Sequence, residues 1–412
     1  MELRPGYKQT EVGVIPEDWN VVHFSELLEF RNGVNADKDA YGKGTPFVNV
    51  LEIITKGHLS ASDIPGKVSL TKRAIDSYAV CSGDLLFNRT SETQEEVGLT
   101  AVYLDDEPVV FGGFVIRGRP TTRDIDATFS GYAFRAPSIR SQIVARGQGA
   151  IRANIGQSDL RQILIALPKL PEQRAIATAL SDMDALIGAL DRLIAKKRDL
   201  KQAAMQQLLT GQTRLPGFSG KWKVKLLGEV LDKIVGGGTP SRLNPSYWGN
   251  EIPWVTVKDF ATFHPYQTQE TITPEGLKQS ASNLIPKGTL ITSTRMALGK
   301  AVIYKVDVSI NQDLKALFPK QCINKKFLYY WFEFHASAID DLGSGSTVKG
   351  ISLADIKAIR FDLASLDEQI AIATILSDMD AEIAALEARQ DKTRALKQGM
   401  TQELLTGGIR LM

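Results

Sequence analysis

The 412-residue chain is poor in the residue types that build metal centres and disulfide frameworks. It has two cysteines, Cys81 and Cys322, and four histidines, all far apart in sequence. No CxxC, HxxxH or HExxH spacing occurs, which argues against a structural zinc site and a disulfide framework. The chain also lacks an apolar run of the roughly 18–20 residues that cross a bilayer, and its start lacks the apolar core of a signal peptide. These absences predict a cytoplasmic protein that does not enter a membrane.

Net positive charge is scarce as well. The formal charge is +2, whereas proteins that bind nucleic acid are commonly strongly basic. By segment, however, the charge is −4 over residues 1–150, +4 over 151–215, +5 over 216–366 and −3 over 367–412. The small total is a sum of opposite contributions, so a local basic patch remains compatible with the sequence.

Recognisable catalytic motifs are missing. The glycines at 147–149 and 236–238 do not stand in a dinucleotide-binding or Walker A pattern. Residues 244–247 differ by one residue from the Asn-Pro-Pro-Tyr loop of amino-methyltransferases, and residues 313–315 lack the upstream acidic ligand of a metal-dependent nuclease. Two pairs of carboxylates, at 182/184 and 378/380, are spaced to point to different faces of a helix. We therefore predict no catalytic residues and no metal site in this chain.

What the sequence does contain is an internal repeat. Residues 172–215 realign without a gap on residues 368–411, and most positions are identical. Upstream of these segments the correspondence weakens to a pattern: the stretch ending in Arg89 corresponds to the stretch ending in Arg295, and Trp19 corresponds to Trp222. The chain is therefore a tandem duplication whose copies diverged in their first 130 or so residues and stayed alike at their ends.

The conserved segment of each copy reads as a long helix. Apolar residues recur in steps of four and three, Pro171 suits a first turn and Gly211 suits a C-terminal stop. About 38 residues give a rod on the order of 55 Å, too long to bury its apolar stripe on one small domain. We expect the two rods to pack as an antiparallel coiled coil. The residues expected in helix–helix packing are Ile176, Leu180, Met183, Ile187, Leu190, Ile194, Ile372, Leu376, Met379, Ile383 and Leu386.

The predicted fold class is α+β, with two mixed α/β domains in a tandem pseudo-two-fold repeat and two long helices. The expected parts are a first domain at 1–155 with an N-terminal arm at 1–18, a helix at 168–211, a second domain at 216–352 and a helix at 366–408. Segments 24–30 and 325–337 look helical, and 109–116 reads as a strand. Residues 4–7 resemble residues 215–218, so the segment 407–412 is expected to lie where the N-terminus begins.

Basic residues next to small polar ones are the candidates for nucleic-acid contact. Arg89 and Arg295 each end a strand in corresponding places, among Ser, Thr and Asn residues that can bind base edges and phosphates. Arg152 and Lys349 follow glycine pairs that let backbone amides approach an anion. A turn-capping arginine or a solvated strand face explains the same residues without DNA. The full candidate set is Asn49, Asn88, Arg89, Arg117, Arg119, Arg152, Thr256, Lys258, Thr294, Arg295 and Lys349.

Taken together, these motifs resemble the specificity subunit of type I restriction-modification systems. Two diverged domains are each followed by a helix carrying EQ-AIA and LSDMD and ending in LLTG, and the chain opens with KQTEVGVIPEDW. The resemblance covers essentially the whole chain. It implies two target recognition domains, each reading one half of an asymmetric bipartite site in double-stranded DNA, and helices that set the gap and dock methyltransferase subunits, expected to number two.

The resemblance also implies a subunit without catalysis. S-adenosylmethionine, Mg and ATP are expected only on partner subunits, and a restriction and translocation subunit is a further candidate partner. Two alternatives stay open: a coiled-coil scaffold with two protein-binding domains, and a DNA-modifying enzyme with its own active site. The charge of the first domain leads us to expect weak DNA binding by the chain alone.

Overall fold

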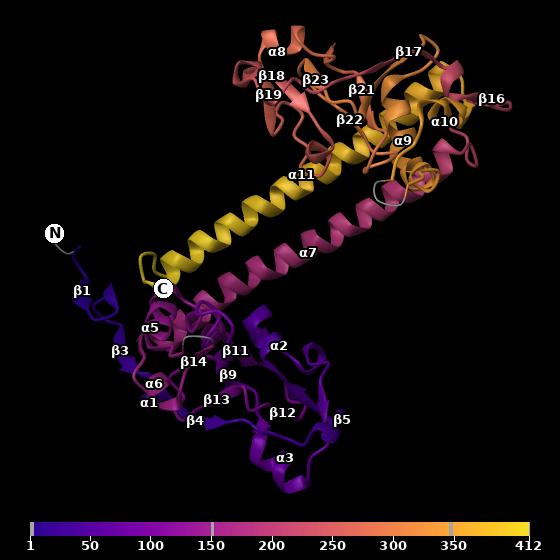
Figure 1. Ribbon diagram of the computed structural model, residues 1–412. Helices are drawn as coiled ribbons and strands as arrows, with labels where there is room; N and C mark the ends of the chain where they lie inside the picture. The colour runs from indigo at the N-terminus through magenta and orange to yellow at the C-terminus, as the bar shows by residue number, and fades with distance from the viewer. Residues whose placement is uncertain (1–3, 150–151, 346–348, 412) are drawn as a thin grey trace. The chain divides into compact units, whose positions relative to one another are not determined.

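The computed structural model describes residues 4–149, 152–345 and 349–411 (Figure 1). The chain divides into two compact units, and each unit combines most of one copy of the repeat with the last part of the other copy. Unit 1 is Met1–Asp191 with Arg389–Met412, and unit 2 is Arg192–Ala388. Unit 1 is therefore assembled from two stretches that are distant in sequence.

Two β-sheets form the body of unit 1. The first has the strand order β4 (Leu28–Asn32), β13 (Val115–Pro120), β9 (Leu85–Asn88), β11 (Thr100–Tyr103), β6 (His58–Leu59). The second has the order β7 (Lys67–Val68), β5 (Tyr41–Val48), β12 (Val109–Phe111), β8 (Ala79–Val80). The central strand β9 is buried along its whole length, because both faces of its sheet are covered.

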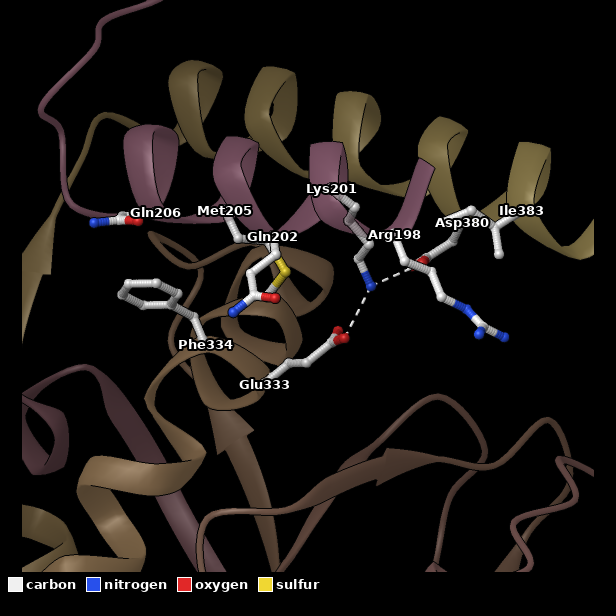
Figure 2. Close-up of a pocket in the computed structure, with 9 residues that line it drawn as sticks. All are labelled: Arg198, Lys201, Gln202, Met205, Gln206, Glu333, Phe334, Asp380 and Ile383. Atoms are coloured by element: carbon white, nitrogen blue, oxygen red, sulfur yellow. Dashed lines mark hydrogen bonds and ion pairs between the residues drawn. The ribbon is translucent and has the colours of Figure 1, made fainter. Parts of the chain in front are cut away.

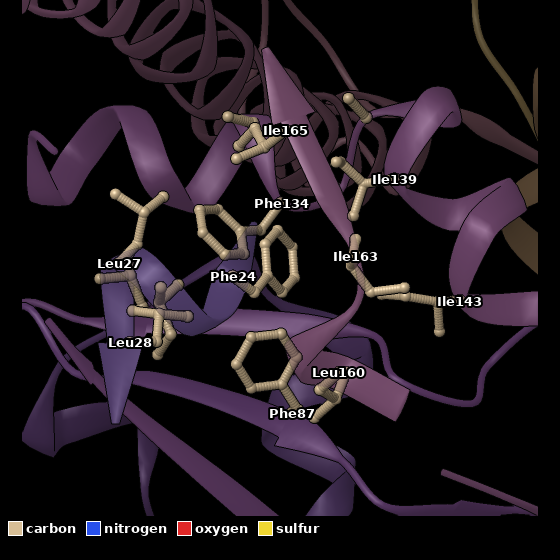
Figure 3. Close-up of a cluster of buried hydrophobic side chains, with 14 of the residues drawn as sticks. Phe24, Leu27, Leu28, Phe87, Phe134, Ile139, Ile143, Leu160, Ile163 and Ile165 are labelled. Atoms are coloured by element: carbon tan, nitrogen blue, oxygen red, sulfur yellow. The ribbon is translucent and has the colours of Figure 1, made fainter. Parts of the chain in front are cut away.

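The two faces of β9 enter different cores. Leu86 packs with Val48, Tyr103 and Phe111 in a cluster built from both sheets. Leu85 and Phe87, which alternate with Leu86, join a larger cluster with helical residues (Figure 3). The helices of unit 1 other than the long one are α1 (Phe24–Leu27), α2 (Val50–Thr55), α3 (Lys72–Tyr78), α4 (Ala127–Ala133), α5 (Pro137–Arg146) and α6 (Gln157–Arg161).

Unit 2 repeats this plan with fewer residues. Its first sheet has the order β17 (Leu231–Gly236), β24 (Leu314–Pro319), β21 (Leu290–Ser293), β22 (Ala301–Ile303). Its second has the order β19 (Glu270–Ile272), β18 (Trp248–Val255), β23 (Val308–Ile310), β20 (Leu284–Ile285). The shorter helices are α8 (Pro274–Lys278), α9 (Lys325–Asp341) and α10 (Leu353–Ala358). In both units the strand that enters the long helix pairs with an early strand: β15 (Leu164–Leu167) with β3 (Asn20–His23), and β25 (Arg360–Leu363) with β16 (Lys223–Leu226).

The two long helices are α7 (Leu170–Leu209) and α11 (Leu366–Leu405). Within unit 1, Lys397 pairs with Asp184 and Gln390 donates to Asp191 at 2.6 Å, so residue numbers rise along one helix as they fall along the other. Unit 2 shows the same antiparallel register, with Lys201 2.8 Å from Asp380. The predicted fold class is confirmed.

All eleven residues of the predicted apolar stripe are buried or half-buried. All of them were expected in helix–helix packing, but the residues at the ends of the stripe belong to the domain cores. Ile176 and Leu180 belong to the domain core of unit 1, which also takes in Leu404 and Leu405 of α11. Ile372 and Leu376 belong in the same way to the core of unit 2. The ends of the stripe therefore join helices to domain, and only its middle is left for helix–helix packing.

In each unit a tryptophan and an arginine bind the same buried glutamate. We call these sets, Trp19–Glu172–Arg410 and Trp222–Glu368–Arg214, the clasps of units 1 and 2. In unit 2 Trp222 donates to Glu368 at 3.0 Å, and Arg214 donates to both oxygens of the same carboxylate. In unit 1 Trp19 donates to Glu172 at 3.0 Å, and the arginine is supplied by the segment that follows α11.

That arginine is Arg410, which binds Glu172 and also binds Asp18 through two hydrogen bonds of 2.9 Å. Tyr7, in β1 (Tyr7–Thr10), which pairs with β2 (Gly13–Pro16), donates to the Gly407 carbonyl at 2.7 Å. The expected closure of segment 407–412 on the N-terminus is thus confirmed as far as Arg410; Met412 lies outside the described residues.

Candidate nucleic-acid interface

Each unit has a short two-stranded ribbon at the end of its central strand. In unit 1, β10 (Thr90–Ser91) pairs with β14 (Ala153–Asn154), and the Ile155 amide donates to the Arg89 carbonyl at 3.0 Å. We call residues 89–91 and 152–155 ribbon 1. It brings together Arg89 and Arg152, which the sequence offered as separate candidates.

The equivalent feature of unit 2 is formed by residues 294–296 and 349–351, which we call ribbon 2. Arg295 pairs with Gly350, and the Ile351 amide donates to the Thr294 carbonyl at 3.0 Å. The Met296 amide donates to the Lys349 carbonyl, also at 3.0 Å. Ribbon 2 therefore gathers three candidates: Thr294, Arg295 and Lys349.

The two ribbons show that Arg89 and Arg295 do not occupy corresponding places, as the sequence had suggested. Ile155 and Ile351 are equivalent in the repeat, and they bond to Arg89 and Thr294 respectively. Arg89 thus corresponds to Thr294, and Thr90 corresponds to Arg295. Because successive side chains of a strand point to opposite faces, the two arginines leave their ribbons in different directions.

Two of the four cations in the ribbons, Arg152 and Arg295, are exposed and weakly paired. The side chains of Arg152 and Arg295 are 61% and 57% exposed, and their nearest carboxylates, Glu92 and Asp313, lie 4.0 and 3.7 Å away. Lys349 makes a closer pair with Asp340, at 2.7 Å. Exposed ion pairs of this kind contribute little to stability, so a phosphate can replace the carboxylate at small cost. Arg89 is half-buried, and its guanidinium donates to the Gly113 carbonyl.

Three other candidates in unit 1 are engaged inside the domain. Asn88 is fully buried and donates its amide to the Glu96 carbonyl at 3.0 Å. Arg117 is 5% exposed, and burial lowers its pKa. Arg119 makes two hydrogen bonds of 2.9 and 2.7 Å with the buried Asp84, and this pairing raises the pKa of Arg119. These side chains stabilise the sheet and, in this structure, do not present a surface to DNA.

Two of the remaining candidates, Asn49 and Thr256, lie at the starts of short helices. The backbone amide of Asn49 donates to the Glu52 carboxylate at the start of α2. The backbone amide of Thr256 donates to the Asp259 carboxylate in the same way, at 2.7 Å. Thr294, in ribbon 2, is nearly buried and donates its hydroxyl to the Asp313 carbonyl. Lys258 is exposed. The sequence pattern Asn/Thr-x-x-Glu/Asp was the available signal that Asn49 and Thr256 are helix caps.

Two exposed apolar side chains beside the arginines were not anticipated. Phe114 is 55% exposed, and its carbonyl accepts a hydrogen bond from the Arg89 amide at 2.8 Å. Met296, which follows Arg295 directly, is 65% exposed. Neither residue stands out in the sequence, because an apolar residue at the end of a strand is usually buried.

A hollow lies beside the helix pair in each unit. In unit 2 it measures about 500 Å³, and Lys201 lies at its centre with Glu333 and Asp380 both at 2.8 Å (Figure 2). Burial alone would lower the pKa of Lys201, but the hydrogen bonds with these carboxylates outweigh it and raise the pKa. Tyr330 also donates to Asp380, at 2.7 Å.

The hollow of unit 1 measures about 700 Å³ and includes Lys397 and Asp184, which are equivalent in the repeat to Lys201 and Asp380. Lys397 pairs with Asp184, and Tyr132 donates to the same carboxylate at 2.8 Å. His58 also lines this hollow, with its ring 4.4 Å from that of Tyr132. Each unit thus carries one open hollow of shared design next to the conserved helices.

Among residues 4–149, 152–345 and 349–411, no three His, Cys, Asp or Glu side chains are grouped so as to hold a metal ion. No helix in the same ranges is long and apolar enough to cross a membrane.

Comparison with known proteins gives a match in both units. The family model described as type I restriction modification DNA specificity domain matches residues 16–196 and again 219–394. A relative from Methanocaldococcus jannaschii, the putative type I restriction enzyme MjaX specificity subunit, is 27% identical over 422 residues. The match covers 98% of this chain and 97% of the relative.

Solved structures share the fold. The S subunit of a type I restriction-modification system from M. genitalium matches with a TM-score of 0.57 at 15% identity, covering 98% of both chains. The HsdS subunit from Thermoanaerobacter tengcongensis matches with a TM-score of 0.52 at 21% identity, covering 96% of this chain and 98% of the other.

Proposed function

The chain belongs to the family of type I restriction-modification DNA specificity subunits, and from this premise we propose that it is the non-catalytic subunit that selects the DNA sequence. The observation that carries the proposal is the repetition of the family domain in both units, with conserved helix ends and diverged ribbons. Because the two units share a fold but differ in their ribbons, they are suited to bind two different DNA sequences. The complete target would then be an asymmetric bipartite site.

Ribbons 1 and 2 are the surfaces that we propose for half-site recognition. Each combines an arginine with polar side chains, the mixture that binds base edges and phosphates. Thr90 and Asn154 of ribbon 1 are joined side chain to side chain at 2.7 Å, which holds two polar groups in fixed positions. The one-residue offset of the arginines makes the two ribbons chemically different readers.

We further propose that α7 and α11 set the gap between the half-sites. Each helix begins in one unit and ends in the other. An insertion after Leu209 would disturb buried residues at the end of α7, since Leu208 and Leu209 belong to the core of unit 2. The sharper test inserts seven residues after Arg192 and seven after Ala388, which preserves the antiparallel register.

Seven helical residues add about 10 Å, equivalent to about three base pairs at 3.4 Å each. Methylation mapping in a host that carries the partner subunits should show unchanged half-sites and a gap longer by about three base pairs. Two seven-residue replacements at the same places are the matched control. An unchanged gap with intact methylation would contradict the spacing role.

The hollows at Lys201 and Lys397 support a docking role for the helices. Because the repeat gives each unit one hollow of the same design, the chain offers two equivalent sites, as expected for two methyltransferase subunits. In this proposal S-adenosylmethionine, Mg and ATP bind partner subunits, a restriction and translocation subunit can join the complex, and the cytoplasm is the compartment.

The competing functions have direct tests. Incubation of the purified chain with DNA, Mg²⁺ and S-adenosylmethionine should give no reaction, and activity would indicate an enzyme. A scaffold without DNA binding would show no salt-dependent shift of duplex DNA even with methyltransferase subunits present. We expect the chain alone to bind weakly, and the assembled complex to bind strongly and with a steep dependence on salt.

A further inference from the structure

Met296 has an unusual backbone conformation. Its φ is +68°, and among the described residues it is the one non-glycine residue with a positive φ. For an L-residue with a side chain this region is strained, and such strain persists where the surrounding structure enforces it, often at functional sites. The strain at Met296 therefore calls for a functional explanation.

The neighbours of Met296 hold this conformation in place. Its amide donates to Lys349, and the Ala297 amide donates back to the Arg295 carbonyl at 2.9 Å. Only residues 296–298 lead from ribbon 2 to Gly299, whereas unit 1 uses residues 91–97 before its equivalent Gly98. A glycine at 296 would fit this tight turn without strain. The chain instead keeps a large apolar side chain there, and that side chain is 65% exposed.

The surroundings of Met296 are open and contain cations with nearby carboxylates. Arg295 precedes it and lies 3.7 Å from Asp313, and Lys349 lies across the ribbon, 2.7 Å from Asp340. An open hollow of about 470 Å³ lies beside it, with Lys300 and Asp340 in the lining. A flexible apolar side chain between cations matches the way DNA-binding proteins place Met, Leu or Phe at a base step while basic residues hold the phosphates.

We propose that Met296 enters the base stack of the half-site read by unit 2, as an apolar wedge that partly unstacks one base step. This inference rests on the proposed function. Unit 1 places Phe114 beside Arg89, but Phe114 corresponds in the repeat to Asp313 and not to Met296. The wedge therefore belongs to unit 2, and its effect is confined to one half-site.

The test uses the chain assembled with its methyltransferase subunits, and duplex DNA that carries the mapped site with 2-aminopurine at successive positions. Fluorescence should rise at one position of the unit 2 half-site when the parent complex binds. M296A and M296G should both abolish the rise and weaken binding about tenfold, the size of one lost base contact. M296G should also raise the midpoint of thermal unfolding, because glycine relieves the strain.

Leu243 is the matched control, since it is an apolar residue of unit 2 that is 95% exposed and outside ribbon 2. L243A should leave the fluorescence rise unchanged. The wedge is overturned if the parent complex binds its site without any fluorescence rise, if both Met296 variants behave like the parent, or if L243A has the same effect as M296A. Failure of the parent complex to bind any bipartite site would instead overturn the proposed function.

Discussion

Units 1 and 2 build the same pair of neighbouring strands with opposite chemistry. In unit 1, β9 and β13 meet around Asp84, Arg117 and Arg119, which are paired inside the domain. The equivalent positions of unit 2 hold Thr289, Ala316 and Phe318, by the register that pairs Arg117 with Leu86 and Ala316 with Ile291. One fold therefore accepts either a buried ion cluster or a set of uncharged side chains at this place. The cluster is a local solution of unit 1, and its arginines are not a sign of DNA binding.

The largest effect on stability is expected for D84A. Removal of the carboxylate leaves Arg117 buried without a charged partner, which should cost about 3 kcal/mol in the free energy of unfolding. The matched variant is the triple replacement D84T/R117A/R119F, which copies unit 2. It should recover most of the loss, because an apolar set can replace a buried ion pair. Denaturant unfolding measures both, and equal losses would show that the cluster is not interchangeable.

The arginines of the two clasps differ in their second partner, because Arg410 also binds Asp18 whereas Arg214 donates to backbone carbonyls. R410A should lower the free energy of unfolding by about 2 kcal/mol, and R214A should also lower it, since each variant leaves a buried glutamate with only its tryptophan partner. Only R410A should speed amide hydrogen exchange in β1 and β2, because Arg410 also binds Asp18 close to those strands. If R214A speeds exchange there equally, the clasps do not act within their own units.

The third comparison concerns the lysines of the two hollows. K201M should cost about 1–2 kcal/mol and K397M less, because Lys201 binds two carboxylates and Lys397 binds one. The raised pKa of Lys201 fixes the pH window: its contribution is complete below the unfolded pKa near 10.4 and is lost as pH rises through the higher folded value. K201M should therefore flatten the alkaline end of the stability curve, and an unchanged curve would contradict the assignment.

The smallest effect is expected at two half-buried histidines. Burial lowers the pKa of His58 in unit 1 and of His335 in unit 2, so both are held neutral in the folded state. Their contribution is complete above the unfolded pKa near 6.5 and is lost as pH falls towards the folded values. H58Q and H335Q should each reduce the drop in unfolding midpoint between pH 7.5 and 5.5. A drop unaffected by either variant would assign the acid sensitivity to other groups.

The sequence predicted features whose determinants are local or repeated. The long helices follow from an apolar stripe that continues over many turns, and the antiparallel pairing follows from the duplication. Segment 24–30 was only partly predicted: α1 ends at Leu27, and Leu28 begins β4, because pairing with β13 overrides the local preference. Segment 109–116 divides into β12 and β13 at Gly112 and Gly113.

The candidate site was harder to predict, because burial and register are decided by distant residues. Arg117 and Arg119 depend on Asp84, more than thirty residues earlier in the chain. The offset between Arg89 and Arg295 became visible only through the backbone bonds of Ile155 and Ile351. Arg152 and Lys349 were expected to bind a phosphate because glycine pairs precede them in the sequence. In the structure Arg152 lies in ribbon 1 with Arg89, and Lys349 lies in ribbon 2 with Arg295.

The clasp at Glu172 has a consequence for the order in which the chain folds during synthesis. Domains generally fold as the ribosome releases them, the N-terminal one first. Here the core of unit 1 includes Leu404 and Leu405, and its clasp requires Arg410, all translated after the whole of unit 2. The half of the protein that is made first is therefore the half that is completed last, and until then its unfinished core must be kept from aggregating.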